Sequence, residues 1–231
     1  RIMENYPEVV TERFDDANFH INYCLKFIKK YMRGNILEVG AGCGSFTRNY
    51  LNPEINSITL TEVDDKNILD LKEKFKNNQK IKITKENIYN INQEFDVIIY
   101  LHVLEHIKND EEEIKEATKK LGKNGTLIIM VPAHKKIFSN LDSAVGHFRR
   151  YEMNFFHKKF DNLEISSVKY LDSMGYFLYY LNKLVFKKEV YPSKLKIFIW
   201  DKIFTPISAV TDFMLRYKFG KCILAVYKKL N

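Results

Sequence analysis

A strand that runs directly into a glycine-rich turn is the feature that most constrains the fold of this chain. Residues 36–39 form a short apolar run broken only by Glu38, and the turn that follows carries Gly40, Gly42 and Gly44. Glycines permit backbone angles that are closed to other residues, and they let the main chain come close to a ligand. The residues after the turn are expected to begin a helix, whose first N–H groups have no partner within the helix. Together these features predict the ligand-binding corner of a doubly wound α/β sheet.

The remaining hydrophobic pattern alternates between strands and helices. We expect strands at residues 36–39, 57–62, 81–84, 95–100, 126–131, 163–171 and 221–227, and helices at 15–32, 65–75 and 109–121. The continuous apolar run at 95–100 is typical of a central parallel strand that is covered on both faces. The alternation predicts an α/β fold with a doubly wound, mostly parallel, seven-stranded, Rossmann-like sheet and an N-terminal helix. Asp64 precedes the helix at 65–75 and is expected to cap it.

A chain of 231 residues usually makes one domain. We expect an N-terminal helical segment at 1–33, a cofactor-binding core at 34–172, a helical cap at 173–220 and a final strand at 221–231. The cap holds two aromatic-rich apolar runs, each too short to span a membrane. It is expected to form two helices and to act as a lid over the carboxyl edge of the sheet, with some aromatic side chains packed and others lining a pocket.

The composition argues against several classes of protein. The net charge is +8, but the lysines are spread along the chain rather than gathered in a stripe, so no nucleic-acid partner is expected. Cys24, Cys43 and Cys222 are far apart and odd in number, which indicates neither a disulfide framework nor a zinc motif. They suit a reducing compartment, and the start of the chain does not have the pattern of a signal peptide. A cytoplasmic location is therefore expected.

The spacing of the turn glycines resembles motif I of the class I S-adenosylmethionine-dependent methyltransferases. The turn has the pattern G-x-G-x-G, whereas dinucleotide enzymes carry G-x-G-x-x-G, and an acid stands two residues before the first glycine. The resemblance implies that S-adenosyl-L-methionine is the cofactor and S-adenosyl-L-homocysteine its product. It also implies that the acid orients the methionine end of the cofactor and that the turn passes beneath it. The residues concerned are Glu38, Gly40, Ala41, Gly42 and Gly44.

Further cofactor contacts are expected at the ends of the next strands. Glu62 ends the second strand, with Val63 beside it, and a carboxylate there can accept hydrogen bonds from both ribose hydroxyls, as the resemblance also implies. Asn87 matches an aspartate that contacts the adenine amino group in the family, and an amide oxygen can accept the same bond. Ile88 matches the apolar residue against the adenine ring. The sulfonium group would pass the end of the fourth strand, at Tyr100, Leu101 and His102.

Two motifs supply the candidates for catalysis. The string V-L-E-H-I resembles the segment after the fourth strand of many small-molecule methyltransferases, the type 11 and 12 group, and its Glu105 and His106 are either catalytic or hold the loop. The string G-H-x-R-R-Y at 146–151 resembles a subgroup of bacterial methyltransferases that often work with glycosyltransferases in surface-glycan or natural-product pathways. His147 is our first choice as the catalytic base and His106 our second, because histidine titrates near neutral pH.

Substrate contacts are expected from the same second motif and from the cap. Arg149 and Arg150 can hold a carboxylate or a phosphate, and Tyr151 and Tyr176 are expected beside the acceptor. The alternative is that this motif has a structural role and holds its own loop in place through an ion pair between Asp142 and an arginine.

These residues predict an S-adenosylmethionine-dependent methyltransferase that acts on a hydroxyl group, or less favourably an amine, of a small molecule, sugar or glycan. The methyl group on a sulfonium is already activated, so alignment of the acceptor can contribute about 7–11 kcal/mol. A base adds about 10²–10⁴-fold for a hydroxyl acceptor, which makes an O-methyltransferase the favoured interpretation. The lysine-rich aromatic cap also suits peripheral contact with a membrane or a lipid-linked substrate. The oligomeric state is left open.

Two alternatives remain. His102, Glu105 and His106, with a later His147 or His134, carry nitrogen and oxygen donors. They loosely resemble the E-x-x-E-H metal site of methyltransferases that act on small-RNA 3′ ends or on quinones, although His102 stands where those have glutamate. A metal-dependent enzyme with an RNA or quinone-type acceptor is therefore one rival of the favoured interpretation, which needs no metal. The other rival is a cofactor-binding regulatory subunit without catalysis.

Overall fold

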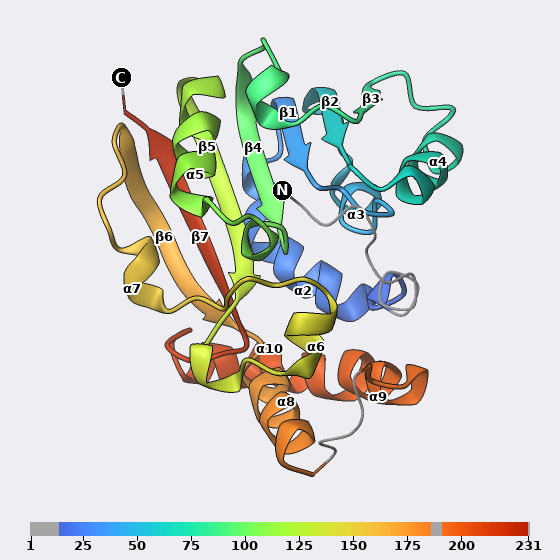
Figure 1. Cartoon of the computed structure of the whole chain (residues 1–231), viewed down its shortest axis with the longest axis vertical. Coiled ribbons are helices and arrows are strands. Elements are labelled where there is room, and N and C mark those ends of the chain that lie inside the picture. The colour runs from blue at the N-terminus through green and yellow to red at the C-terminus, as the bar shows by residue number, and fades with distance from the viewer. Residues whose placement is uncertain (1–13, 186–190, 231) are drawn as a thin grey trace.

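The computed structural model describes residues 14–185 and 191–230, and within them seven strands form one sheet (Figure 1). Their order across the sheet is β3-β2-β1-β4-β5-β7-β6. The strands are β1 Gly34–Val39, β2 Ile55–Thr61, β3 Ile81–Thr84, β4 Phe95–Leu101, β5 Leu121–Pro132, β6 Leu163–Leu171 and β7 Cys222–Lys229. Strands β1 to β5 run parallel, and β7 is antiparallel to both β5 and β6. The predicted seven-stranded, mostly parallel sheet is confirmed.

The strand order places a topological switch between β1 and β4. The chain passes from β1 outward through β2 to β3, and then returns to pair β4 with the other side of β1. Val39 at the end of β1 is in register with Thr61 of β2 and with Tyr100 of β4. The loops after these three strands therefore meet at one edge of the sheet, where open α/β folds bind their ligands.

Helices pack on both faces of the sheet (Figure 1). One face is covered by α5 Asp110–Lys120 and α7 Met153–Phe156, and the other by α2 Asn18–Ile28, α3 Thr47–Tyr50 and α4 Asp65–Lys74. The shorter elements are the 3₁₀ turns η1 Lys29–Tyr31, η2 Ile88–Asn90, η3 Leu104–His106 and η4 Lys135–Ile137, and the helix α6 Asn140–Ala144. Asp64 caps α4 as predicted, because its carboxylate accepts the N–H of Asn67 at 2.9 Å.

The N-terminal helix is shorter than the predicted range of 15–32. It begins at Asn18, because Ala17 has a non-helical ψ of 58°, and its last turn tightens into the 3₁₀ turn η1. Residues 1–13 of the predicted N-terminal segment lie outside the described part of the chain. Strand β5 is longer than predicted, because its pairing with β4 already begins at Leu121.

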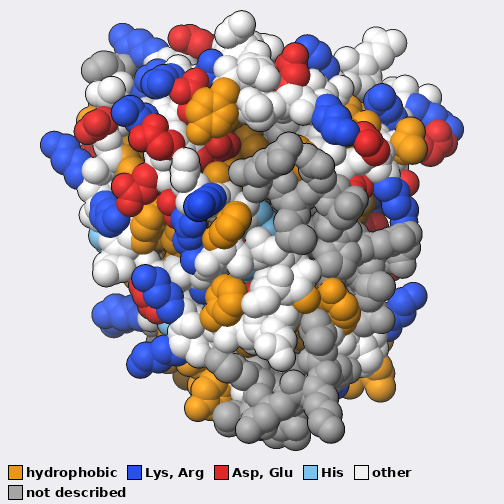
Figure 2. All heavy atoms as spheres, viewed as in Figure 1, with side chains coloured by type: hydrophobic (Ala, Val, Ile, Leu, Met, Phe, Trp, Pro, Cys, Tyr) orange, Lys and Arg blue, Asp and Glu red, His pale blue; other side chains and the backbone are white. Residues whose placement is uncertain are grey.

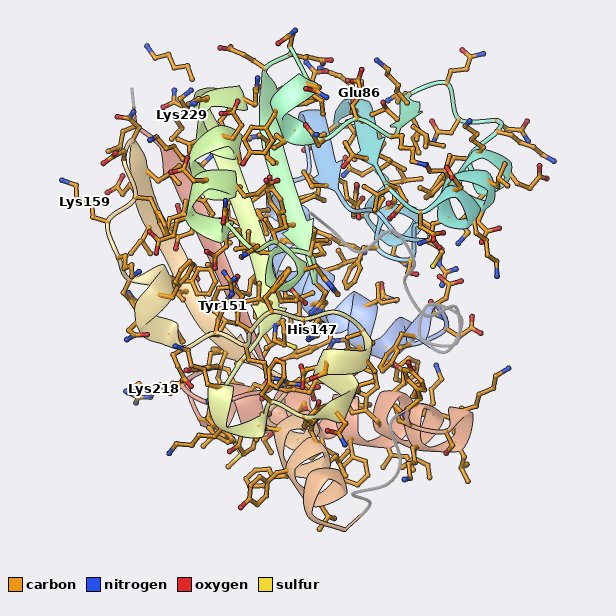
Figure 3. The ribbon with its side chains drawn as sticks, viewed as in Figure 1. Glu86, His147, Tyr151, Lys159, Lys218 and Lys229 are labelled. Carbon is orange, nitrogen blue, oxygen red and sulfur yellow. The ribbon has the colours of Figure 1, made fainter. Side chains whose placement is uncertain are left out.

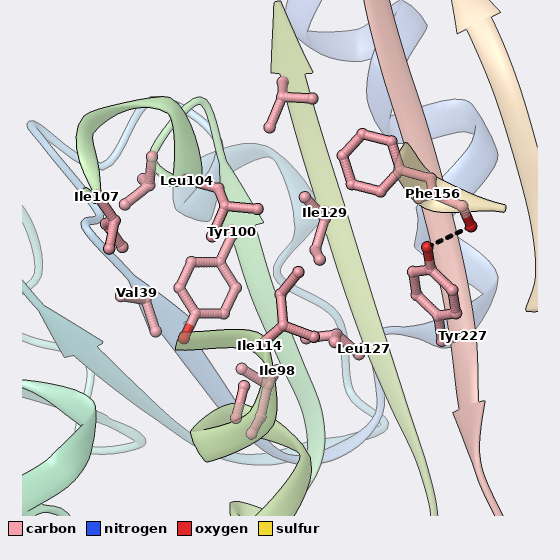
Figure 4. Close-up of a cluster of buried hydrophobic side chains, with 14 of the residues drawn as sticks. Val39, Ile98, Tyr100, Leu104, Ile107, Ile114, Leu127, Ile129, Phe156 and Tyr227 are labelled. Carbon is pink, nitrogen blue, oxygen red and sulfur yellow. Dashed lines mark hydrogen bonds between the residues drawn. The ribbon is translucent and has the colours of Figure 1, made fainter. Parts of the chain in front are cut away.

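Strand β4 lies at the centre of the core (Figure 4). Ile98 and Tyr100 pack together with Ile114 of α5, whereas Val97 and Ile99 belong to the cluster that includes α2. All five side chains are at most 1% exposed, so the strand is covered on both faces as predicted. Truncating a buried residue such as Ile114 to alanine would cost about 2–5 kcal/mol. The carboxyl end of β4 is therefore held firmly at the ligand-binding edge.

The cap folds as two helical stretches. The first is α8 Ser173–Val185, and the second runs through α9 Lys194–Ile199, the π-helical turn η5 Trp200–Phe204 and α10 Thr205–Met214. The backbone N–H of Thr205 donates to the carbonyl of Trp200, five residues earlier, and the hydroxyl of Thr205 donates to the same carbonyl at 3.2 Å. The helix therefore widens for one turn before α10. Figure 1 shows the cap at the end of the molecule that faces the carboxyl edge of the sheet.

Candidate active site

A cavity of about 1310 Å³ opens at the carboxyl ends of β1 and β4. The glycine turn, the loops after β2, β3 and β4, part of α2, the segment 132–150 and the cap helices α8 and α9 contribute to its wall. Small-molecule sites usually measure about 300–1,000 Å³, so this cavity has room for two ligands side by side. His147 lies between the sheet edge and the cap (Figure 3), and a histidine is visible near the centre of this face in Figure 2.

The glycine turn leaves one open position toward the cavity. Gly40, Gly42 and Gly44 all have positive φ, of 66°, 55° and 78°. A Cβ on Gly40 would lie 2.7 Å from Val103, and a Cβ on Gly44 would lie 2.8 Å from Phe75. A Cβ on Gly42 would meet no atom within 4 Å. Close packing therefore requires glycine at Gly40 and Gly44, whereas Gly42 borders space that a ligand can fill.

Glu62, directly after β2, joins this turn to the neighbouring loop. Its Oε2 accepts the N–H of Gly42 at 2.7 Å, and its Oε1 accepts the N–H groups of Val63 and Asp64 at 2.8 and 3.0 Å. The residue is 8% exposed and lines the cavity. Burial raises the pKa of its carboxyl above the usual value, although the three N–H groups oppose the shift. A carboxylate has about four lone-pair sites, so about one remains for a ligand.

Glu38 and Tyr100, both predicted beside the cofactor, do not line the cavity. Glu38 is buried beneath the turn, where it accepts hydrogen bonds from the hydroxyls of Thr47 and Tyr50 at 2.6 Å each, and burial raises its pKa to about 7. Tyr100 packs against α5 and donates to Glu113 at 3.0 Å. Side chains alternate along a strand, so a residue whose backbone lies near the ligand can point into the core. These two side chains attach α3 and α5 to the sheet.

Gly44 does not line the cavity either, but the other predicted cofactor residues do. Ala41, Val63, Asn87, Ile88, Leu101 and His102 all line it. The amide oxygen of Asn87, which we expected to meet adenine, accepts the N–H of Tyr89 at 3.1 Å and so caps η2. An amide oxygen has two lone pairs, so this bond leaves one acceptor position.

His147 and Asp142 form a hydrogen-bonded pair at the cavity wall. The Nδ1 of His147 lies 2.8 Å from Asp142 Oδ1. Burial would raise the pKa of Asp142, but the hydrogen bond from His147 and the charge of Arg150 hold it well below its usual range. The carboxylate is therefore ionised, and Nδ1 is the nitrogen that carries the proton. A histidine held in this tautomer has its Nε2 available as a base.

Asp142 also holds the loop in place. It accepts hydrogen bonds from Arg150 Nε at 2.8 Å, from the hydroxyl of Tyr179 at 2.8 Å and from the N–H of Ser139 at 2.9 Å. Arg150 is 4% exposed and donates as well to the carbonyl of Ala133 at 3.2 Å. The ion pair between Asp142 and an arginine, which the sequence offered as the alternative role of this motif, is therefore present. Asp142 also forms the hydrogen bond that orients His147. Arg150 lines the cavity, and its hydrogen bonds to Asp142 and Ala133 use two of the five N–H groups of its guanidinium.

Glu105 is a fully buried carboxylate that lines the cavity, and neither of its oxygens has a hydrogen-bond partner among the described residues. His102 Nδ1 and His147 Nε2 lie 3.7 and 3.8 Å from its Oε1, and the ring of His106 is 4.7 Å from that of His147. Burial lowers the pKa of His106 to about 4. Burial would also lower the pKa of His102, but its contacts with Cys222 and Glu105 raise it to about 10.

Three residues predicted to bind substrate lie away from the cavity. Arg149 pairs with Asp110 at 2.5 Å. Tyr151 is 2% exposed and donates to the same carboxylate at 2.9 Å. Tyr176 packs edge-on against Phe219, with ring centroids 4.4 Å apart. Arg149 and Tyr151 flank Arg150, which does line the cavity, and Tyr176 belongs to α8. Their contacts with a substrate stay predictions.

Among the residues that the structure describes, two groups of side chains could hold a metal ion, with the ligand atoms of each group within 4.8 Å of one another. The groups are Glu105 with His106 and His147, and His20 with His102 and Cys222. His134, considered earlier as a further ligand, belongs to neither, because its Nε2 contacts the carbonyl of Gly220 at 2.9 Å. Sequence reasoning missed His20 and Cys222, since only the packing of α2 against β7 and the loop after β4 brings these distant residues together.

Residues 16–166 match the family described as Methyltransferase domain, and the chain belongs to this family. It is an S-adenosylmethionine-dependent methyltransferase. The alternative of a regulatory subunit without catalysis is therefore set aside. No curated protein matches the chain.

Solved structures with the same fold include enzymes of more than one activity. The N-methyltransferase NodS from Bradyrhizobium japonicum WM9, in complex with S-adenosyl-L-homocysteine, has a TM-score of 0.61 at 17% identity, over 95% of this chain and 91% of that chain. Coclaurine N-methyltransferase bound to N-methylheliamine and S-adenosyl-L-homocysteine has a TM-score of 0.61 at 14% identity, over 91% and 72%. The cyclase SpnF has a TM-score of 0.60 at 13% identity, over 90% and 81%. Such identities show the fold alone, so the acceptor must be argued from the site.

Proposed function

We propose that this enzyme transfers a methyl group from S-adenosylmethionine to a hydroxyl group of a small molecule or sugar, with His147 as the base. The supporting observation is the 2.8 Å bond from His147 to an ionised Asp142, which leaves Nε2 as the basic nitrogen of a side chain that lines the cavity. A hydroxyl must lose its proton as the new C–O bond forms, and a positioned base adds about 10²–10⁴-fold. The two N-methyltransferases of similar fold make an amine the second choice of acceptor.

The cofactor would occupy the part of the cavity nearest β1 and β2. Its methionine moiety would lie over Ala41 and Gly42, where a Cβ on the glycine meets nothing. The remaining acceptor position of Glu62 would bind the ribose, and Asn87 and Ile88 would meet the adenine. The backbone of Leu101 and His102 would pass the sulfonium group. Glu38 and Gly44 support the turn from below, and Tyr100 contributes through its backbone only.

The reaction would exchange a carbon–sulfur bond for a carbon–oxygen bond, and the O–H bond of the acceptor for an N–H bond on His147. Bound S-adenosylmethionine would supply an activated methyl group for attack by the acceptor oxygen, with S-adenosylhomocysteine as the leaving group that keeps the electron pair of the carbon–sulfur bond. The acceptor proton passes to Nε2 of His147. The imidazolium that results lies between two carboxylates, Asp142 at 2.8 Å and Glu105 at 3.8 Å, and both favour its positive charge. His106, our second choice, is less suited to the role, because burial lowers its pKa to about 4.

The acceptor would occupy the part of the cavity next to the cap. Tyr179 and Trp200 line that part together with Leu178 and Ile197. Aromatic faces with a polar edge suit a sugar or an aromatic ring, which supports a small-molecule acceptor.

We place the enzyme in the G-H-x-R-R-Y subgroup on the strength of the motif, and in the cytoplasm because its three cysteines are free thiols.

The test compares turnover with cofactor binding. Production of S-adenosylhomocysteine is measured with a panel of hydroxyl and amine acceptors, and calorimetry measures affinity for S-adenosylhomocysteine. His147→Asn should lower turnover by about 10²–10⁴-fold with cofactor affinity unchanged. Full turnover in His147→Asn would remove this residue as the base, and acceptance of amines alone would replace the hydroxyl acceptor with an amine.

A metal-assisted reaction is the second candidate, favoured by the unpartnered oxygens of the buried Glu105. Glu105, His106 and His147 would hold a divalent transition metal, a donor set that such ions accept. A bound metal acts as a Lewis acid that lowers the pKa of a coordinated hydroxyl. Metal analysis of the purified enzyme and a Co²⁺ absorption spectrum would report binding without an activity assay. Metal-free protein with full turnover in excess chelator would eliminate this candidate.

A further inference from the structure

Helix α10 has its polar side buried and its apolar side exposed. The buried side carries Thr205, Ser208 and Asp212, each at most 2% exposed. The exposed side forms a stripe at helical spacing, 41–74% exposed, made of Ile207, Val210, Phe213 and Met214. A surface helix of a globular protein normally has the reverse arrangement, with its apolar stripe toward the core.

Polar contacts fix this orientation. Asp212 accepts the hydroxyl of Tyr23 at 2.6 Å and the N–H groups of Asp172 and Ser173 at 2.7 and 2.9 Å. The hydroxyl of Ser208 donates to the buried carboxylate of Asp172 at 2.9 Å. Burying a carboxylate is unfavourable unless hydrogen bonds satisfy it, and here they do. The outward apolar stripe is therefore a consequence of a specific buried network and not of loose packing.

The stripe belongs to a larger apolar surface. Of the eighteen large hydrophobic residues exposed in the described part of the chain, eleven are in the cap. We call them the apolar cap face: Phe177, Tyr180, Leu181, Leu195, Phe198, Ile203, Ile207, Val210, Phe213, Met214 and Leu215. Helices α8 and α10 pack against each other, and α9 continues into α10 through η5. A monomeric soluble protein rarely exposes apolar side chains at this density, which marks a protein or membrane contact.

The charges around this face are of one sign. Within the described residues of the cap, the acids Asp201 and Asp212 are at most 1% exposed, whereas Lys194, Arg216 and Lys218 are exposed. Lys218 points outward from the molecule in Figure 3, and basic and hydrophobic side chains lie near each other over the cap in Figure 2. An apolar face bordered by basic residues matches an anionic lipid surface. A second copy of the chain is a poorer match, because each copy carries a net charge of +8.

We propose that the apolar cap face docks on an anionic membrane surface, with α10 lying in the interface. No helix in the described residues is long and apolar enough to cross a membrane, so the contact is peripheral. Leu181 is 55% exposed and also lines the cavity, so the acceptor side of the cavity reaches the docking face. If the proposed function holds, the acceptor is an amphiphile whose hydroxyl-bearing head group enters from the lipid surface.

Co-sedimentation of the purified full chain with lipid vesicles tests the docking without any methyltransferase assay. Vesicles of phosphatidylcholine are compared with vesicles that contain about 25% phosphatidylglycerol. The wild type should pellet with the anionic vesicles at low salt, and Val210→Asp with Phe213→Asp should lower the partition coefficient by about tenfold or more. Leu69→Asp is the matched control, since Leu69 is 65% exposed on α4 and should change nothing.

Reversing the charge of basic residues in the cap measures the electrostatic contribution to membrane binding. Lys194→Glu with Lys218→Glu should weaken binding by about fivefold per residue, whereas the reversal of two exposed lysines elsewhere, Lys72→Glu with Lys82→Glu, should have less effect. Absence of wild-type binding to anionic vesicles at low salt would overturn the proposal. An equal loss in the Leu69→Asp control would overturn it too. A dimer in light scattering that Phe213→Asp dissociates, without vesicle binding, would assign the face to a second copy instead.

Discussion

Asp142→Asn tests whether one carboxylate both orients the base and holds its loop. The asparagine keeps the shape of the side chain but removes the charge, so Arg150, which is 4% exposed, loses its ionic partner at 2.8 Å. Removing one partner of a buried ion pair costs about 3–5 kcal/mol. For a chain of this length, each kcal/mol lowers the melting temperature by about 2–4 °C. Calorimetry should therefore show a melting temperature lower by about 6–20 °C.

The difference in melting temperature between the wild type and Asp142→Asn should depend on pH in a defined direction. The folded-state pKa of Asp142 is lowered, so its carboxylate stabilises the fold fully above the unfolded pKa of about 3.9. This contribution is lost as the pH falls through the folded pKa. The gap in melting temperature between wild type and Asp142→Asn should therefore be constant near neutral pH and narrow in acid.

Catalysis should respond to the same change. The amide does not hold the Nδ1–H tautomer of His147, so turnover should fall by about 10²–10⁴-fold. Cofactor affinity should stay near wild type, since Asp142 makes no hydrogen bond to the glycine turn or to Glu62. Asp70→Asn, at an exposed position of α4, is the control. Wild-type stability and turnover in Asp142→Asn would refute the role of this carboxylate.

Three further outcomes follow from the geometry. Glu62→Ala should raise the dissociation constant for S-adenosylhomocysteine by about 10–150-fold, since one charge-assisted hydrogen bond is lost; an unchanged constant would place the ribose elsewhere. Gly42→Val should abolish cofactor binding in a folded protein, because φ is 55° and the added side chain fills the open space; calorimetry with a melting curve as control would detect any retained binding. In hydrogen exchange, α10 should exchange as slowly as β4, because Asp212 is buried, whereas α8 should exchange faster without ligand than with it. Uniformly slow exchange in α8 without ligand would make the cap fixed core rather than a lid.

Local patterns in the sequence were enough to predict the sheet and the cofactor corner. The apolar run of β4, the glycines at 40, 42 and 44 and the cap residue Asp64 each act through the backbone of their own segment. A strand buried on both faces, a turn with positive φ and a helix N-cap have sequence requirements that extend over only a few residues. The order of elements then leaves few topologies for the sheet.

The direction of individual side chains was decided only by the tertiary structure. Tyr100 and Tyr151 stand in motifs that border the cavity, yet both point into the core, because neighbouring residues on a strand or in a tight loop face opposite ways. The pairing of His147 with Asp142, the isolation of Glu105 among histidines, and the meeting of His20 with Cys222 depend on segments that are distant in the chain.

Helix α10 shows the physical reason most clearly. Its sequence has an apolar stripe and a polar stripe, and periodicity alone assigns the apolar one to the core. In the folded chain, buried hydrogen-bond donors from α2, from Asp172 after β6 and from the start of α8 pair with the polar stripe, so Asp212 turns inward and Phe213 outward. Amphipathicity is a property of the helix itself, whereas the face that is buried depends on which partners the rest of the chain presents to it.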